Sequence, residues 1–361
     1  MFLERKNKQT PIHVFQHMDS KQNRVSGHST HSGQAIDASF APEASLEALR
    51  ARALLLESIR QFFKQRSVLE VETPLLCHAA VQDPHLHPIP AQYQPFGNAS
   101  PQTLYLQTSP EFAMKRLLAA NIGPIYQLCK AFRNGEVGKI HNPEFTMLEW
   151  YRPGFNHHQL MNEMDDFLAF ILNTQTAERI SYQDLFLMHL DLDPFQATQL
   201  ELQNKAKDKK INLDKNMPST LTNDDWLNLL LTHSIEPKLG FERPVMVFDF
   251  PKSQAALAKI RKTPHFEVAE RFEVYMNGME LANGYHELTD GNILEQRLYQ
   301  DAATRKQLNH PEIPIDSHLL NALKAGLPDC AGVALGFDRL LMLKMNAKEI
   351  REVLAFTIEK A

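Results

Sequence analysis

Residues 133–151 read Arg-Asn-Gly-Glu-Val-Gly-Lys-Ile-His-Asn-Pro-Glu-Phe-Thr-Met-Leu-Glu-Trp-Tyr, and this stretch decides the fold. Residues 125–132, which precede it, are rich in strand formers. Gly135 and Gly138 then supply a loop, and Pro143 marks the start of a second strand. The sequence therefore predicts a β-hairpin with a polar loop between its two strands.

The second strand of this hairpin carries a face that is unusual for a core. Because side chains alternate along a strand, Phe145, Met147, Glu149 and Tyr151 point to the same side. Arg133 lies across the hairpin from them. We interpret this face as the wall of a pocket for a ligand with a flat part, a phosphate and a cationic group.

A second hairpin is predicted in residues 272–283, Phe-Glu-Val-Tyr-Met-Asn-Gly-Met-Glu-Leu-Ala-Asn, because its central Asn-Gly is a strong turn signal. A two-residue turn pairs Tyr275 with Glu280, so that Glu273 faces Ala282. Glu273, Tyr275 and Glu280 then share a face. We expect no basic neighbour there, so the two carboxylates repel each other unless a cation lies between them. The alternative is a solvent-exposed acidic face.

Residues 332–343, Gly-Val-Ala-Leu-Gly-Phe-Asp-Arg-Leu-Leu-Met-Leu, read as a strand of small residues that runs into a helix. Glycines in such a strand let a ligand approach the backbone closely. Arg339 has two interpretations, an ordinary arginine near a helix start or a contact to a ligand.

Elsewhere the pattern predicts mainly helices. Ser45 is the expected N-cap of a helix that runs to about residue 65, and a short strand follows at residues 68–72. Residues 77–103 are rich in proline, and we favour an ordered connection that lines the pocket over ligands at Asp83, His85 and His87. A helical insertion is predicted at about residues 175–243.

Composition narrows the class of protein. The chain has 361 residues, 43% of them hydrophobic and 22% charged, which is ordinary for a globular protein. Its formal net charge of −5 gives no overall basic footprint and weighs against tRNA as a partner. Cys77, Cys129 and Cys330 are far apart and odd in number, which favours the reducing cytoplasm. We find no apolar run long enough for a membrane span.

Residues 1–44 are polar and without apolar periodicity, and we predict a flexible N-terminal extension there. Its histidines offer metal binding as an alternative, although their spacing fits no single helix face: His13, His17, His28 and His31.

Residues 133–151 resemble motif 2 of the class II lysyl-tRNA synthetases, and the ending Glu-Trp-Tyr is closer to their truncated paralogues, the elongation factor P–(R)-β-lysine ligases. Residues 45–74 are similar to motif 1, which that family uses as its dimer interface, and residues 332–343 to motif 3. The resemblance covers about residues 46–361. It implies an α+β fold at residues 45–361, a class II synthetase catalytic domain with an antiparallel sheet flanked by helices, and a homodimer.

Two features indicate the protein-modifying branch of the family. An anticodon-binding OB-fold needs roughly a hundred residues before motif 1, and only 44 polar residues precede it here. The middle glycine of motif 3 is replaced by Ala334, as in the paralogues. One departure is Gly135-Glu136, where Glu-Glu or Glu-Gly is usual, so Glu136 is the expected substitute for an acidic contact to ATP.

The resemblance implies roles for individual residues. The expected catalytic residues are Arg133 and Arg339. The expected ATP-binding residues are Arg133, Asn134, Gly135, Glu136, His141, Asn142, Phe145, Glu280, Leu281, Gly336 and Arg339. The substrate lysine is expected to contact Ser109, Pro110, Glu111, Glu149, Tyr151, Asn283, Glu287 and Ala334. The expected Mg²⁺ ligands are Glu273 and Glu280. From the residues alone, Glu111 is also a carboxylate that stabilises a helix dipole.

The implied reaction is ATP-dependent activation of (R)-β-lysine and its transfer to a lysine of elongation factor P. Three alternatives stay open: a truncated enzyme that charges tRNA, a lysine-activating enzyme with another acceptor, and a synthetase-like regulator without activity. The retention of Arg133, Arg339, Glu273 and Glu280 speaks against the regulator.

Overall fold

The computed structural model describes residues 40–97, 100–212 and 221–361. The predicted extension at residues 1–44 lies almost wholly outside these ranges, and its four histidines lie entirely outside them. Within the described ranges, no helix is both long and apolar enough to cross a membrane. Cys77, Cys129 and Cys330 are free thiols.

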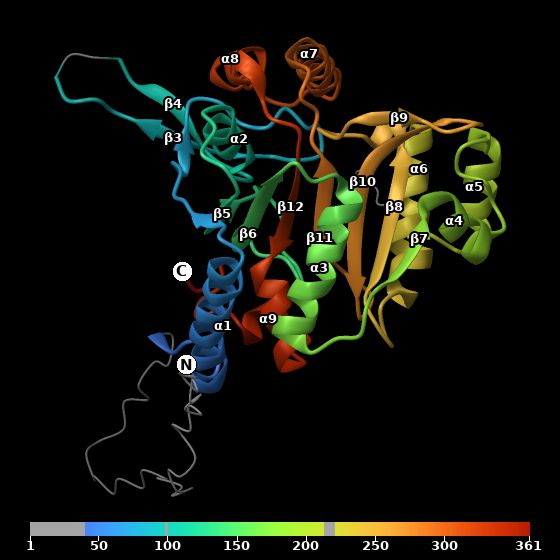
Figure 1. The fold of residues 1–361 in the computed structure, drawn as a ribbon, viewed down its shortest axis with the longest axis horizontal. Helices are drawn as coiled ribbons and strands as arrows, with labels where there is room; N and C mark the ends of the chain where they lie inside the picture. The colour runs from blue at the N-terminus through green and yellow to red at the C-terminus, as the bar shows by residue number, and fades with distance from the viewer. Residues whose placement is uncertain (1–39, 98–99, 213–220) are drawn as a thin grey trace, which may run out of the picture. The chain divides into compact units, whose positions relative to one another are not determined.

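A mixed sheet organises the chain from Pro42 onward (Figure 1). Its inner strands pair antiparallel, and a short parallel strand lies at each edge. Across the sheet the strands are β1 (Leu69–Glu70), β5 (Ile125–Phe132), β6 (Glu144–Pro153), β12 (Cys330–Gly336), β11 (Met279–His286), β10 (Glu267–Met276), β8 (Val245–Pro251) and β7 (Glu178–Ser181). A further strand, β9 (Ile260–Lys262), pairs with β10. This confirms the predicted fold class.

The first predicted hairpin is β5–β6. Ala131 lies opposite Phe145, and Gln127 lies opposite Glu149, as the alternation of side chains requires. On the far side of β6, β12 adds the small-residue strand, with Ala334 opposite Glu149. The first and third sequence signals thus lie on neighbouring strands.

Three helices cover one face of the sheet: α1 (Leu46–Gln65), α3 (His157–Leu172) and α9 (Phe337–Met345) (Figure 1). Ser45 caps α1 as predicted, since its hydroxyl accepts from the Ala48 amide. Between the helices and the sheet lies an aromatic core, in which the Phe63 and Tyr126 rings stack with centroids 4.3 Å apart. Burial of each such ring contributes about 2 kcal/mol, so this face is the stable base of the sheet.

Three further helices share a second apolar core at one end of the strands. They are α2 (Glu111–Ala119), α7 (Gly291–Gln307) and α8 (Ser317–Gly326). Pro110 is the N-cap of α2. A small sheet lies nearby, in the order β2 (Leu76–Cys77), β4 (Gln102–Leu106) and β3 (Ile89–Tyr93).

Between α3 and β8 the chain builds a unit with its own core. It contains β7, α4 (Tyr182–Leu190), α5 (Gln199–Asp208) and α6 (Asn223–Leu230), which continues as a π-helix over Leu231–Ile235. Thr222 and Asp225 form a capping box at the start of α6. This unit extends the sheet through the parallel pairing of β7 with β8.

The second predicted hairpin is β10–β11, but its predicted register is wrong beyond the first two pairs. Tyr275 lies opposite Glu280 as expected, whereas Glu273 lies opposite Asn283 and not opposite Ala282. The reason is a β-bulge that leaves Leu281 without a partner residue on β10. The side chains after the bulge therefore point to the opposite face from the one that strict alternation gives.

Candidate functional site

A cavity of about 430 Å³ lies on the face of the sheet that α1, α3 and α9 leave open. Of the predicted site residues, Pro110, Asn134 and Gly135 do not line it. The others do: Ser109, Glu111, Arg133, Glu136, His141, Asn142, Phe145, Glu149, Tyr151, Glu273, Glu280, Leu281, Asn283, Glu287, Ala334, Gly336 and Arg339. The structure thus brings together residues from both hairpins, from β12 and from the start of α2 and α9.

The bulge at Leu281 makes this convergence possible. Glu280 shares a face with Tyr275, and Asn283 shares the same face because it lies opposite Glu273. Without the bulge, Glu280 and Asn283 would point to opposite sides. Strict alternation puts Glu280 and Asn283 on opposite faces, although both were predicted to contact the ligands. This conflict was the signal in the sequence that could have revealed the bulge.

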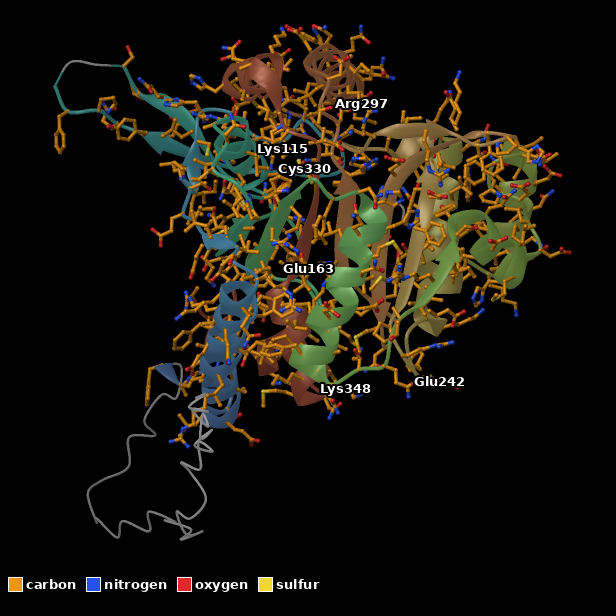
Figure 2. The ribbon with its side chains drawn as sticks, viewed as in Figure 1. Lys115, Glu163, Glu242, Arg297, Cys330 and Lys348 are labelled. Carbon is orange, nitrogen blue, oxygen red and sulfur yellow. The ribbon has the colours of Figure 1, made fainter. Side chains whose placement is uncertain are left out.

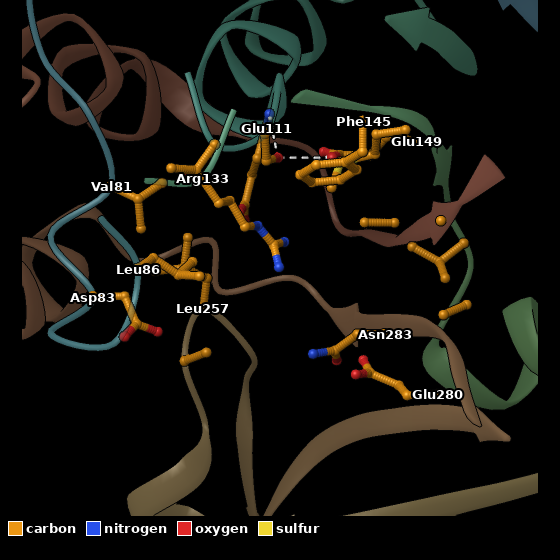
Figure 3. A pocket seen from close by; sticks show the side chains of 18 of the residues that line it. Val81, Asp83, Leu86, Glu111, Arg133, Phe145, Glu149, Leu257, Glu280 and Asn283 are labelled. Carbon is orange, nitrogen blue, oxygen red and sulfur yellow. Dashed lines mark hydrogen bonds between the residues drawn. The ribbon is translucent and has the colours of Figure 1, made fainter. Parts of the chain in front are cut away.

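Arg133 extends into the middle of the cavity (Figure 3). Its guanidinium carbon lies 5.1 Å from the centroid of the Phe145 ring, and Glu136 lies 3.8 Å from one of its nitrogens. Its buried Nε has no hydrogen-bond partner among the described residues. Because a buried guanidinium nitrogen without a partner is costly, a ligand oxygen is the natural occupant of this position.

Arg339 lines the cavity beside Glu280 and His141. It donates to the Glu280 carbonyl oxygen at 2.7 Å and lies 2.7 Å from Nε2 of His141. Burial and the Arg339 charge lower the pKa of His141, so the neutral imidazole accepts this hydrogen bond. Arg339 is therefore held ready for a flat or anionic ligand, and the alternative of a routine helix arginine does not account for its place in the cavity.

A hydrogen-bond network that was not predicted from the sequence lies next to Arg339 in the chain. Asp338 accepts from Arg52 of α1 at 2.6 Å and from the Thr146 amide at 2.7 Å. Arg52 also donates to the Thr146 hydroxyl at 2.7 Å. Helix α1, the β6 strand and the start of α9 are thus joined by one buried network.

The acidic side of the cavity contains a basic neighbour, which corrects the expectation that none exists. Arg271 forms an ion pair with Glu273, whose other oxygen accepts from the Tyr275 hydroxyl. Glu280 and Asn283 point into the cavity nearby (Figure 3). Burial in the cleft and the Glu273 charge raise the pKa of Glu280, which is the repulsion that the sequence predicted.

A third carboxylate, Glu236, adjoins this pair and was missed. Its Oε1 accepts from the Glu280 amide at 3.3 Å, and burial together with the Glu280 charge raises the pKa of Glu236 to about 7. Oxygen ligands gathered in this way suit Mg²⁺. Glu273 and Glu280 therefore fit a magnesium ion, which would relieve the repulsion that their positions create.

Glu149 lies at the end of the cavity where the sequence predicts contacts to the amino acid, and it is almost fully buried. Ser109 donates to one of its oxygens at 2.7 Å, and Tyr151 donates to the other at 2.6 Å. Burial and the Glu111 charge nevertheless raise the pKa of Glu149 to about 8. Two neutral donors do not compensate for the buried negative charge, so the carboxylate favours a cationic ligand.

Lys115 is the principal residue that sequence reasoning missed here (Figure 2). Its ammonium lies 2.6 Å from Glu111 and 2.6 Å from Glu287, with only 2% of the side chain exposed. Burial acts to lower the pKa of Lys115, but the two carboxylates outweigh it and raise the pKa. Burial and the Glu111 charge raise the pKa of Glu287 to about 7 even with Lys115 beside it.

The charges at this end do not balance within the chain. Glu111, Glu149 and Glu287 provide three carboxylates, and Lys115 provides one ammonium. With all of them ionised the net charge is −2. A ligand with two ammonium groups would neutralise this end of the cavity.

Gly332 leaves the space for such a ligand. A Cβ atom at this position would lie 2.3 Å from a ring carbon of Tyr151 and 2.5 Å from Oε1 of Glu287. These distances are far below van der Waals contact, so only glycine lets β12 pass this close to both side chains.

The proline-rich connection forms one rim of the cavity, as we predicted. Val81, Asp83, His85 and Leu86 line it, whereas the His87 ring packs against His310. Arg305 of α7 donates to the carbonyl oxygens of Asp83 and Leu86. These hydrogen bonds explain how residues 78–88 of the connection, which contain no helix or strand, keep a fixed shape.

Comparisons with known proteins agree with this geometry. The sequence model of the family described as tRNA synthetases class II (D, K and N) matches residues 36–360. The chain is 49% identical to the elongation factor P–(R)-β-lysine ligase of Salmonella arizonae and 50% identical to that of Salmonella typhi. Each alignment covers 324 residues, which is 90% of this chain and 99% of the relative.

Proposed function

The chain belongs to the class II tRNA synthetases of the D, K and N group, and we propose that it is an ATP-dependent ligase that activates (R)-β-lysine and transfers it to a lysine side chain of elongation factor P. The names of its relatives supply both substrates. The observation that carries the proposal is that Glu111, Glu149, Glu287 and Lys115 have a net charge of −2 when all of them are ionised. The two ammonium groups of a diamino acid would neutralise this charge and leave its carboxylate to react with ATP, whereas a neutral side chain would leave buried carboxylates unpaired.

In the first step the amino-acid carboxylate attacks the α-phosphorus of ATP, and pyrophosphate leaves. Arg133, whose buried Nε lacks a partner among the described residues, neutralises charge that develops on the phosphate. Phe145 stacks on adenine, and Arg339 closes the ATP side beside Glu280 and His141. Mg²⁺ held by Glu273 and Glu280 would supply further positive charge at the phosphates.

The second step needs no nucleophile from the enzyme. The ε-amine of the acceptor lysine attacks the carbonyl carbon of the adenylate, an amide forms, and AMP leaves. Catalysis is then a matter of positioning and electrostatics. The buried network of Arg52, Thr146 and Asp338 keeps the wall that carries Phe145 in place during both steps.

The test is ATP–pyrophosphate exchange with (R)-β-lysine and α-lysine in parallel, followed by mass spectrometry of elongation factor P from the same organism. We expect exchange that prefers the β isomer and a mass gain of one lysyl residue on the factor. An Arg133→Ala variant should abolish exchange, and Arg351→Ala, on an exposed turn outside the cavity, is the matched control. Exchange without transfer would keep adenylation and favour another acceptor. Absence of exchange with either amino acid would refute the proposal that the chain is an amino-acid-activating enzyme.

We also propose a homodimer formed through α1 and the edge strand β1, in the cytoplasm that the free cysteines favour. Three leucines on these elements have large exposed fractions: Leu46 63%, Leu54 62% and Leu69 51%. Among the described strands β1 pairs only with β5, so its other edge is open to a second copy. Leu54→Glu should convert the dimer to a monomer in light-scattering measurements, whereas Leu200→Glu, an exposed leucine on α5, should not.

A further inference from the structure

A second cluster of ionisable groups lies on the helix-covered face of the sheet, away from the cavity. Because Arg271 and Tyr285 pair on the cavity face, their neighbours Glu270 and His286 point to the opposite side. His157, the first residue of α3, meets them there. The ligand atoms of His157, Glu270 and His286 all lie within 4.8 Å of one another.

His157 is the unusual member of this cluster. Only 2% of it is exposed, yet neither ring nitrogen has a hydrogen-bond partner among the residues that the structure describes. Burial and the neighbouring His158 charge hold the pKa of His157 well below its usual range, so the ring is neutral and has a free lone pair. Two unsatisfied nitrogens in the interior call for a partner that the described residues do not supply.

The other two members contact each other and neighbouring charged groups. Oε2 of Glu270 lies 2.5 Å from Nδ1 of His286, while Arg261 approaches the other oxygen at 3.6 Å. Nε2 of His286 lies 2.8 Å from Asp329 and 3.2 Å from Lys259. Asp329 holds the outer nitrogen of His286, as a carboxylate does behind a metal-bound imidazole, and an ion would take the place of the hydrogen bond between Nδ1 and Glu270.

We propose that His157, Glu270 and His286 form a binding site for a divalent transition metal ion of the zinc class. Two imidazoles and one carboxylate suit Zn²⁺, whereas Mg²⁺ prefers oxygen ligands alone. The surrounding charges admit a cation, because Asp249, Glu270 and Asp329 carry three negative charges, and Lys259 and Arg261 carry two positive ones. The ion would join α3 to β10 and β11 from behind the cavity.

The site is tested by thermal unfolding of the full chain with Zn²⁺ or Mg²⁺ alone, without either substrate. At Zn²⁺ a hundredfold above its Kd, we expect Tm to rise by about 3–6 °C, and Mg²⁺ at that concentration should not reproduce the rise. His157→Gln should remove the shift. His158→Gln, one residue further along the same helix, should keep it. Co²⁺ should give visible absorption bands of a low-coordinate site in the wild type and lose them in His157→Gln.

The histidines of residues 1–39 could bind zinc independently of the proposed site. The Tm measurement distinguishes the two kinds of binding. An ion bound equally by the folded and unfolded chain leaves Tm unchanged, so only the site in the fold contributes the shift. Glu270→Gln repeats the test in case His157→Gln does not fold. A Tm shift as large in His157→Gln and in Glu270→Gln as in the wild type would overturn the proposal. Zinc bound to the wild type without any Tm shift would overturn it too. Because no substrate is present, failure here leaves the proposed ligase activity untouched.

Discussion

Replacement of Lys115 by methionine most directly tests the arrangement of charges at the end of the cavity where the amino acid is proposed to bind. The ammonium lies 2.6 Å from both Glu111 and Glu287, and the side chains of Lys115 and Glu287 are 2% and 1% exposed. Breaking a buried pair of this kind costs about 3 kcal/mol of unfolding free energy. For a chain of this size we expect Tm to fall by about 6 °C.

The effect on substrate binding follows from the pKa of Glu287, which is about 7 with Lys115 present. Loss of an adjacent opposite charge raises such a pKa by about 2 units, to about 9. At pH 7.5 the ionised fraction of Glu287 then falls from about three quarters to about 3%. Since only the carboxylate pairs with a substrate ammonium, KM for the diamino acid should rise about 25-fold. At pH 9.5 Glu287 ionises again, and the difference should shrink to less than about threefold.

The assay is ATP–pyrophosphate exchange with varied amino acid, measured from pH 7 to 9.5. Lys324→Met, which removes a lysine from an exposed ion pair with Glu295, is the matched control and should change neither KM nor Tm appreciably. A ratio of KM values that stays constant over this pH range would refute the reasoning, because Lys115 would then act through packing and not through charge.

Three further outcomes follow from the cavity. Phe145→Ala should raise KM for ATP about tenfold through lost stacking and leave KM for the amino acid unchanged, and equal effects on both would contradict its place at adenine. Gly332→Ala should lower kcat/KM for the amino acid at least about a hundredfold while calorimetry still shows ATP binding, since the new Cβ meets Tyr151 and Glu287. The substrate-free enzyme should lose thermal stability between pH 5 and 8, because native Glu149 and Glu287 keep protons up to about pH 8 and 7 that the unfolded chain releases near pH 4.5. Glu149→Gln should flatten that decline, and an unchanged slope would argue against a raised pKa.

Much of the site was predictable because its signals are local. The β5–β6 hairpin follows from alternation and from two glycines, and the Asn-Gly turn fixes the first pairs of β10–β11. Arg271 was also within reach, since it alternates with Glu273 and Tyr275 along one strand face. The hairpin predicted from the sequence began at Phe272, one residue after Arg271.

Lys115 could not be recognised from the sequence. Its spacing of four residues from Glu111 is that of an ordinary surface pair on a helix. Only the packing of α2 against α8 buries it and brings Glu287 from a distant strand to its other side. The cluster of His157, Glu270 and His286 is likewise assembled from a helix and two strands, and no short stretch of sequence contains it.

The bulge at Leu281 makes the length of β11 as important as its composition. Deletion of Leu281 would give a strand without a bulge in which Asn283, Tyr285 and Glu287 keep their present face. Insertion of one residue after Asn283 would instead turn Tyr285 and Glu287 to the other face and bring His286 to the cavity side. Such an insertion would alter the cavity and the cluster of His157, Glu270 and His286 together. A substitution in β11 changes one face of the sheet, whereas a change of one residue in its length after Asn283 changes both.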